Sequence, residues 1–183
     1  MRIEPTGLPG VLLLEVPVFR DERGHFLETW RDDTYAQGGV RGPFLQDNAA
    51  FSRAGVLRGL HYQHPHAQGK LVGVVMGEVF DVAVDLRRGS PHFGEWTGHQ
   101  LSAENGRQLW IPPGFAHGYL TLSESAVFVY KCTDVYRPEA DRVVAWNDPE
   151  IGIEWPAGQP VLSPKDARAP RLRDVAADLL PEL

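Results

Sequence analysis

Short apolar runs recur at intervals of about ten residues along the chain, and turn-forming residues separate them. The clearest run alternates between two sets, Phe80, Val82, Val84 and Leu86 against Val79, Asp81, Ala83 and Asp85. This alternation predicts a strand over Val79–Leu86. Only Gly77-Glu78 separates that strand from the run Lys70–Met76, so the two strands are expected to form a hairpin.

The full set of runs predicts an all-β fold, a jelly-roll β-barrel with short peripheral helices. The predicted strands are Val11–Phe19, Phe26–Trp30, Phe44–Asn48, Val56–Gln63, Lys70–Met76, Val79–Leu86, Trp96–Leu101, Gln108–Ile111, Gly118–Leu122, Val127–Thr133 and Val143–Trp146. The predicted helices are Asp32–Gln37 and Arg173–Leu180. The segment after Trp155 is rich in Pro, Gly and Ala and is expected to wrap the barrel, so residues 1–183 are predicted to form a single domain.

The composition of the chain indicates which binding partners and which cellular compartment to expect. The 183 residues carry 18 Lys and Arg against 24 Asp and Glu, a formal net charge of −6, which argues against a nucleic-acid partner. No run approaches the roughly 20 apolar residues that cross a bilayer, so no membrane partner is expected. No signal peptide is evident, and we expect a cytoplasmic protein. The single cysteine, Cys132, excludes an intrachain disulfide and is expected to pack in the core.

Two segments resemble the two-part signature of the cupin superfamily, whose members are small jelly-roll barrels. The first part holds His64-Pro65-His66, Lys70 and Gly77, and the second holds Gly106, Pro112, Gly114 and His117. Metal-binding cupins have a carboxylate where this chain has Lys70, and a protonated amine repels a divalent cation. We therefore predict a cupin-like barrel without a metal, with His64 and His66 in an exposed turn. The alternative is a metal-dependent oxygenase that uses His64, His66 and His117.

Several polar residues interrupt otherwise apolar strands, which is costly unless they line a cavity or find partners. They are Arg58, His61, Lys70, His117 and Tyr130. A neutral imidazole can accept a proton, a phenol can donate one, and an ammonium can stabilise an oxyanion. Together these residues indicate acid–base chemistry inside the barrel.

Longer motifs occur in order from near residue 3 to near residue 170. They are Asp21-Glu22-Arg23-Gly24, Gln46-Asp47-Asn48, the run of residues 55–63, Gln68-Gly69-Lys70-Leu71-Val72, the run of residues 108–112, the run of residues 114–118, Tyr130-Lys131-Cys132-Thr133 and Leu162-Ser163-Pro164-Lys165-Asp166. They closely resemble the dTDP-4-dehydrorhamnose 3,5-epimerase family. The resemblance implies a cofactor-free and metal-free homodimer that inverts C3 and C5 of dTDP-4-dehydro-6-deoxyglucose in dTDP-L-rhamnose biosynthesis.

The resemblance also implies roles for individual residues. His61 matches the general base, Asp166 its carboxylate partner, Tyr130 the acid on the opposite face, and Lys70 the cation near the C4 oxygen. Tyr136 matches the aromatic residue that stacks on thymine. Further contacts to the nucleotide sugar are implied for Arg23, Glu28, Gln46, Asp47, Asn48, Arg58, His117 and Lys165.

Some positions depart from the family pattern. Tyr119 replaces the usual Phe, which is expected to have no consequence, and Asp141 stands in place of a family Glu, so that contact is not inferred. Arg58 and His61 are three residues apart, which would point them to opposite faces of a regular strand. Gly59 could resolve this with a bulge; otherwise Arg58 would act from an edge.

Other functions remain open at this stage. The same residues would serve an epimerase that acts only at C3 or only at C5 of a related dTDP-deoxysugar. A cupin that binds sugar nucleotides without catalysis is disfavoured because both His61 and Tyr130 are present.

Overall fold

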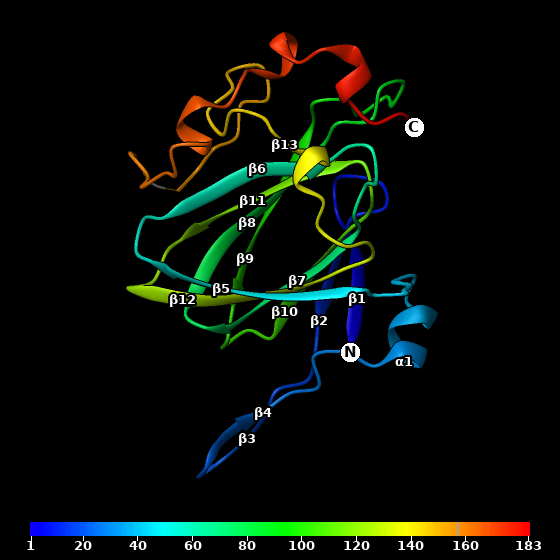
Figure 1. The fold of residues 1–183 in the computed structure, drawn as a ribbon. Helices are drawn as coiled ribbons and strands as arrows, with labels where there is room; N and C mark the ends of the chain where they lie inside the picture. The colour runs from blue at the N-terminus through cyan, green and yellow to red at the C-terminus, as the bar shows by residue number, and fades with distance from the viewer. Residues whose placement is uncertain (157) are drawn as a thin grey trace.

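Two antiparallel sheets face each other in the computed structural model, which describes residues 1–156 and 158–183 (Figure 1). The six-stranded sheet has the order β1 (Arg2–Pro5), β2 (Leu12–Glu15), β10 (Arg107–Ile111), β7 (Lys70–Met76), β12 (Ser125–Cys132) and β5 (Gln46–Arg53). The five-stranded sheet has the order β13 (Asp141–Val143), β6 (Leu57–Gln63), β11 (Phe115–Thr121), β8 (Glu78–Asp85) and β9 (Trp96–Ser102). The predicted all-β jelly roll is confirmed.

The main core lies between the sheets. Val72, Leu109 and Phe128 point inward from the six-stranded sheet and meet Ala83 and Tyr119 of the five-stranded sheet. The Phe128 and Tyr119 rings stack across the gap, with centroids 4.1 Å apart. This packing fixes the separation of the two sheets and therefore the width of the space between them.

The outer face of the five-stranded sheet is covered by the C-terminal third of the chain (Figure 1). Val82 and Val84 pack there against Val144, Ile151 and other apolar residues of that segment. Both faces of β8 are thus buried, and the two acidic residues of the second set, Asp81 and Asp85, are buried with polar partners.

The outer face of the six-stranded sheet is covered only in part. Helix α1 (Asp32–Gln37) was predicted with the same bounds, and its Tyr35 packs with Trp110 over this face. The hairpin of β3 (Phe19–Asp21) and β4 (Gly24–Phe26) projects away from both sheets (Figure 1). Its two phenylalanines are more than 60% exposed, Phe19 at 63% and Phe26 at 67%.

One predicted connection is wrong. Strands β7 and β8 do not form a hairpin, because β7 lies in the six-stranded sheet and β8 in the five-stranded sheet. Gly77, with φ of +78°, carries the chain between the sheets in a single residue. A Cβ there would lie 2.1 Å from the Ser125 carbonyl oxygen, so only glycine fits this crossing.

The predicted C-terminal helix is also wrong. Leu172–Asp174 and Ala177–Leu179 form two separate 3₁₀ turns instead. Asp148 Oδ2 accepts a hydrogen bond from the Leu172 amide at 2.6 Å, and Leu172 and Leu180 enter the core. The chain thereby buries both leucines through two separate turns rather than through one continuous helix. Two further 3₁₀ turns cover Pro138–Ala140 and Asp166–Arg168.

Several strand bounds differ from the prediction. The predicted strand Val11–Phe19 is divided between β2 and β3 around Pro17, which has no amide hydrogen for a sheet. The predicted strand Phe26–Trp30 is confined to its first residue, and Trp30 instead packs its ring on Tyr35, 4.7 Å between centroids. Strands β5 and β11 are longer than predicted and β13 lies earlier in the chain.

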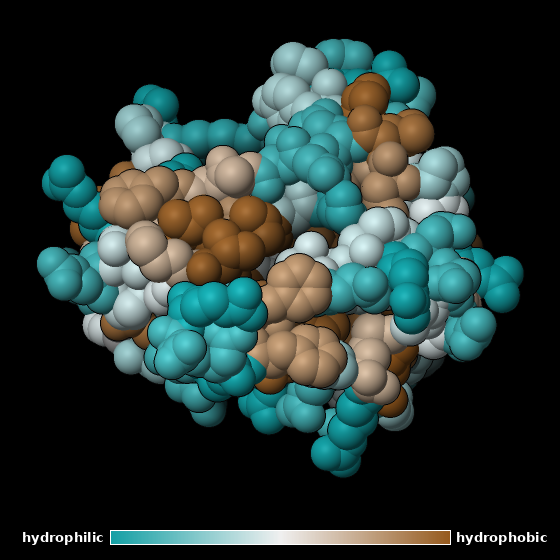
Figure 2. Space-filling view, turned by 90° about the horizontal axis from the view of Figure 1, so that it is seen from below, coloured by the Kyte–Doolittle hydropathy of each residue, from teal (hydrophilic) through white to brown (hydrophobic). Residues whose placement is uncertain are grey.

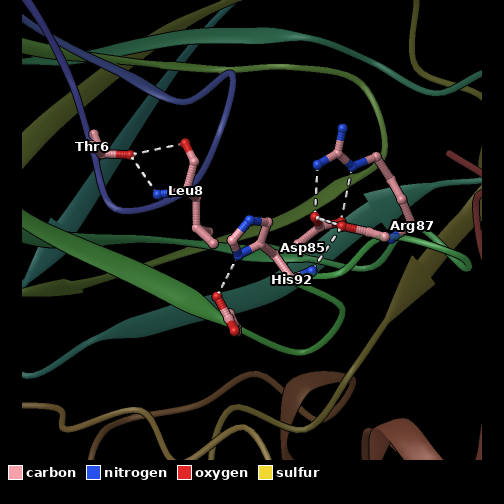
Figure 3. A network of polar contacts seen from close by, with 7 residues as sticks. Thr6, Leu8, Asp85, Arg87 and His92 are labelled. Carbon is pink, nitrogen blue, oxygen red and sulfur yellow. Dashed lines mark hydrogen bonds and ion pairs between the residues drawn. The ribbon is translucent and has the colours of Figure 1, made fainter.

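Polar contacts fix the loops beside β8 and the N-terminal turn (Figure 3). Arg87 Nη2 donates to Asp85 Oδ2 at 2.6 Å, and Ser90 Oγ donates to the same oxygen at 2.7 Å. Thr6 Oγ1 accepts from the Leu8 amide at 3.2 Å.

None of the helices in the described ranges is long and apolar enough to cross a membrane.

Candidate active site

His61 and Asp166 form a close pair at the wall of the barrel. His61 Nε2 lies 2.6 Å from Asp166 Oδ1. His61 projects inward from β6, because its neighbours Leu60 and Tyr62 pack into the outer core. Asp166 begins a 3₁₀ turn in the C-terminal segment, which therefore delivers the carboxylate to the barrel.

The Asp166 carboxylate is held as an anion. Ser163 Oγ donates to Asp166 Oδ2 at 2.8 Å, while Oδ1 faces His61. Burial alone would raise the pKa of this carboxyl, but the hydrogen bonds from His61 and Ser163 and the positive charges nearby lower it below its usual range. A carboxylate so placed fixes the tautomer of His61 and stabilises its protonated form.

Tyr130 stands on the opposite wall. It lies on β12 of the six-stranded sheet, whereas His61 lies on β6 of the five-stranded sheet. Both side chains line a cavity of about 230 Å³ between the sheets, the inter-sheet cavity. Its other lining residues are Ala50, Arg58, Lys70, His117, Tyr119 and Phe128. Burial raises the pKa of Tyr130, so the phenol keeps its proton at neutral pH.

Lys70 lies at the start of β7, beside Cys132 of β12 and Ile111 of β10. Its side chain lines the inter-sheet cavity. Burial lowers the pKa of the Lys70 amine, although the charges of Cys132, Asp141 and Asp81 oppose this shift. No described carboxylate forms an ion pair with Lys70, so the amine can meet an anion in the cavity.

A bulge brings Arg58 and His61 to the same cavity. Along β11 the partners of His61 and Arg58 are His117 and Tyr119, which are only two residues apart. Strand β6 therefore contains one extra residue at Gly59. Gly59 has φ of +132°, and a Cβ would lie 2.6 Å from Gly118 Cα. Of the two alternatives that the sequence left open, a bulge at Gly59 and an edge position of Arg58, the structure has the bulge.

His117 forms a second pair with a carboxylate. Its Nε2 lies 2.8 Å from Asp81 Oδ2, and Asp81 is fully buried. Burial raises the pKa of Asp81, against the opposing influence of His117. The sequence analysis assigned Asp81 no role, although the structure places it on the same face of β8 as Val79 and Ala83, which pack in the main core.

A second pocket of about 160 Å³, the loop pocket, shares His61, Lys70 and Tyr130 with the inter-sheet cavity. Three sequence-predicted residues are held at its rim. The Tyr136 amide donates to Gln46 Oε1 at 2.7 Å, and its hydroxyl donates to Asp141 Oδ2 at 3.0 Å. Lys165 Nζ donates to the same Asp141 oxygen at 2.5 Å. Tyr136 is 52% exposed, so its ring is positioned yet free to stack on a ligand.

The structure thus gathers ten of the thirteen sequence-predicted site residues. Nine line the inter-sheet cavity or the loop pocket: His61, Tyr130, Lys70, Gln46, Asn48, Arg58, His117, Tyr136 and Lys165. The tenth, Asp166, contacts His61. Residues that sequence analysis did not assign to the site also line them, namely Tyr119, Asp141, Gln63, Gln68 and Cys132. Cys132 is buried, as expected, and it faces the loop pocket as well.

Three predicted residues lie elsewhere in the single chain. Asp47 alternates with Gln46 and Asn48 on β5 and pairs with Lys131 on the outer face, Oδ2 to Nζ 2.8 Å. Arg23 lies in the projecting hairpin and is paired with Asp21, Nε to Oδ1 3.1 Å. Glu28 faces Arg31, Oε1 to Nε 3.5 Å. The structure of the single chain does not bring these three residues to the pockets.

The alternative metal site is not assembled. In residues 1–156 and 158–183, no group of three or more His, Cys, Asp or Glu side chains is placed to hold a metal ion. His66 is exposed and His64 is half-buried in the loop between β6 and β7, while His117 is committed to Asp81. The absence of a metal requirement stays a prediction.

Catalysis is therefore expected to survive exhaustive chelation. The reason is that Lys70 occupies the place of an acidic ligand and would repel a divalent cation. The measurement is turnover before and after dialysis against EDTA. Loss of turnover that only one added divalent metal restores would contradict this prediction.

A half-buried histidine held by a buried carboxylate, facing a protonated tyrosine across a jelly roll, is the arrangement of an enzyme that moves protons between two faces of its substrate. A family model described as dTDP-4-dehydrorhamnose 3,5-epimerase matches residues 5–174. The chain belongs to this family.

Similar individual proteins carry the name of the same family. The chain is 58% identical over 167 residues to a dTDP-4-dehydrorhamnose 3,5-epimerase of Neisseria gonorrhoeae, with 91% of the chain and 51% of that relative covered. It spans about half the length of that curated relative, but 100% of one from Pseudomonas aeruginosa, which is 52% identical over 99% of the chain. A solved dTDP-6-deoxy-D-glucose-3,5-epimerase from Legionella pneumophila, in complex with dTDP-4-keto-L-rhamnose, is 50% identical with a TM-score of 0.96, and the match covers 100% of this chain and 98% of that one.

Proposed function

We propose that this protein epimerises dTDP-4-dehydro-6-deoxy-D-glucose at C3 and C5 to dTDP-4-dehydro-L-rhamnose, in dTDP-L-rhamnose biosynthesis. The observation that supports this best is the position of His61 and Tyr130 on facing sheets of one cavity. A hydrogen on a carbon beside a ketone is acidic, because the charge moves to the ketone oxygen. A base on one face and an acid on the other then invert the carbon.

The proposed reaction assigns one step to each group. His61 removes the proton from the carbon, and Asp166 stabilises the resulting imidazolium. The charge that develops on the C4 oxygen meets the Lys70 ammonium. Tyr130 donates a proton to the other face, and both groups exchange protons with water before the second inversion. General acid–base assistance of this kind is worth roughly 10²–10⁴-fold in rate.

The nucleotide end of the substrate fits the loop pocket. Tyr136 offers a fixed aromatic ring for the thymine, and Lys165 adds positive charge at the rim. Arg58, at the inter-sheet cavity, is suited to the diphosphate. Asp141, which holds both Tyr136 and Lys165, acts as their positioning residue.

Direct conversion tests the proposal. Purified protein and dTDP-4-dehydro-6-deoxy-D-glucose are followed by proton NMR, and the expected product carries inverted couplings at C3 and C5. A product inverted at one carbon would support the single-site epimerase, which the same residues would also serve. An unchanged substrate that still binds would support a binding protein without catalysis.

We further propose that the functional unit is a homodimer formed through the outer face of the six-stranded sheet. Figure 2 views this side and shows apolar side chains gathered between polar ones. Phe51 and Val75 are exposed on the sheet at 58% and 45%, and Phe19 and Phe26 are exposed on the projecting hairpin. A second copy would cover both, which a monomer leaves in water.

Such a dimer also gives Arg23 and Glu28 a route to substrate. The hairpin that carries Arg23 extends away from its own barrel (Figure 1). Placed across the dimer, the hairpin would bring Arg23 to the cavity of the second copy, where a guanidinium suits a diphosphate.

Light scattering after size-exclusion chromatography is expected to give a mass near twice 20.4 kDa. Mixing the inactive variants Arg23→Ala and His61→Ala, with exchange of subunits, is expected to restore turnover. One site of the mixed dimer then combines an intact His61 with an Arg23 from the other copy. A mass near 20.4 kDa, or no gain on mixing, would contradict the dimer or the shared site respectively.

The remaining expectations belong to the same proposal. They are one cupin-like domain over residues 1–183, a cytoplasmic location, no cofactor, and neither nucleic acid nor membrane as a partner. Net charge of −6 is consistent with the absence of a nucleic-acid partner.

A further inference from the structure

The Tyr119 hydroxyl, to which the proposed mechanism gives no part, belongs to a chain of polar contacts inside the barrel. Tyr119 Oη lies 3.1 Å from Ser52 Oγ, and Arg58 Nε donates to the same Ser52 oxygen at 3.1 Å. Tyr119 and Ser52 are 3% and 2% exposed, so these contacts are shielded from water. Strand β5 supplies Ser52, whereas β11 and β6 supply Tyr119 and Arg58, so the chain joins the two sheets.

The chain leaves one hydroxyl hydrogen without an acceptor. Ser52 and Tyr119 contribute two hydroxyl hydrogens, and the contact between them uses one. No other acceptor for either hydroxyl is found within the described residues. Either hydroxyl can be the donor in the contact between them. When Ser52 donates to Tyr119, the second hydrogen stays on Tyr119. Tyr119 lines the inter-sheet cavity, so that hydrogen is available to a ligand oxygen there.

We propose that Tyr119 is a further substrate-binding residue, whose hydroxyl donates a hydrogen bond to an oxygen of the sugar, with Ser52 holding it beside Arg58. This inference rests on the proposed function. The sugar is favoured over the nucleotide because Tyr119 shares its cavity with His61, Lys70 and Tyr130. Tyr136 and Gln46, the proposed thymine end, line the loop pocket instead. Tyr119 stands where the family usually has Phe, and the sequence analysis expected this difference to have no consequence. The proposal gives the added hydroxyl a role in binding the sugar.

The test compares two ligands on one variant. Tyr119→Phe removes the hydroxyl and retains the ring that stacks on Phe128. Isothermal titration calorimetry is carried out with dTDP and with dTDP-glucose, which carries a sugar but no ketone and is not turned over. Affinity for dTDP-glucose is expected to fall about 3- to 10-fold, the usual effect of one neutral hydrogen bond, with affinity for dTDP unchanged.

Ser52→Ala separates contact from positioning. It removes the hydroxyl that contacts Tyr119 and one of the hydrogen bonds that position Arg58, whose Nη2 still donates to the Phe51 carbonyl, so affinity is expected to fall for both ligands. Combined with Tyr119→Phe, it should add less than the sum of the single effects for dTDP-glucose. Tyr35→Phe is the matched control, because it removes a buried tyrosine hydroxyl that bonds Gln108 away from the cavity. It should change neither affinity.

Each result has one meaning. Equal affinity of wild type and Tyr119→Phe for dTDP-glucose would overturn the proposal, as would an equal loss for dTDP and dTDP-glucose. Circular dichroism of the variants excludes misfolding as the cause of a loss. If wild type bound neither ligand, the proposed function itself would fail, which is a different outcome.

Discussion

Replacing His61 with alanine is expected to stop deuterium exchange at both C3 and C5 of the substrate in heavy water. His61, which Asp166 holds, lines both the inter-sheet cavity and the loop pocket, whereas the other histidine of the cavity, His117, is paired with Asp81 and does not line the loop pocket. Loss of a general base typically costs roughly 10²–10⁴-fold in rate. The measurement is the rate of deuterium uptake by proton NMR.

Tyr130→Phe should behave differently. Exchange requires only the base, so some deuterium uptake is expected to persist, whereas inversion requires the proton from Tyr130 and is expected to be lost. His92→Ala serves as a matched control, because it breaks a histidine–carboxylate pair with Glu95, 2.7 Å, outside both pockets. Exchange by His61→Ala at the wild-type rate would show that another group is the base.

Lys70→Ala is expected to lower kcat about 10²–10³-fold, with a much smaller rise in KM. The ammonium meets little charge on the ground-state ketone and a developing oxyanion in the transition state. An interaction that strengthens toward the transition state affects kcat, whereas a uniform one affects KM. Lys70→Met, which keeps the length of the side chain without its charge, should lose a similar amount.

Arg58→Ala provides the contrast. The diphosphate proposed to meet Arg58 does not change charge during the reaction, so KM should rise first. Steady-state kinetics on folded variants make the comparison.

Burial lowers the pKa of the Lys70 amine, so the wild-type kcat should begin to fall at a lower pH than it would with a lysine of ordinary pKa. If Lys70→Ala changed only KM, the oxyanion would need another partner, with His117 the next candidate.

Local patterns predicted much of the fold because period-two alternation reports which face of a strand is buried. Strand Lys70–Met76 and helix Asp32–Gln37 have the predicted bounds. The hairpin expected at Gly77-Glu78 fails because a short link is compatible with two geometries, a turn within one sheet and a crossing between two. The sequence does not distinguish the two, whereas in the structure Gly77 makes the crossing and packs tightly against Ser125 of β12.

The site shows the same division. His61, Lys70 and Tyr130 stood out as polar residues in apolar strands, and they converge as predicted. Asp141 and Tyr119 were set aside because they departed from a pattern, yet their partners come from segments distant in sequence, Lys165 and Ser52. Asp47 has the opposite outcome, since strand alternation directs it outward although both neighbours line the pocket.

The central claim is that His61 removes a proton from one face of each carbon and Tyr130 adds one on the other. The most direct test of this claim is deuterium incorporation catalysed by the wild-type protein. dTDP-4-dehydro-6-deoxy-D-glucose is incubated with the protein in heavy water, and the product is analysed by proton NMR at C3 and C5. The arrangement of His61 and Tyr130 predicts deuterium at both carbons of an inverted product. Inverted product that retains its original hydrogen at both carbons, or no uptake at either carbon of a bound substrate, would contradict it.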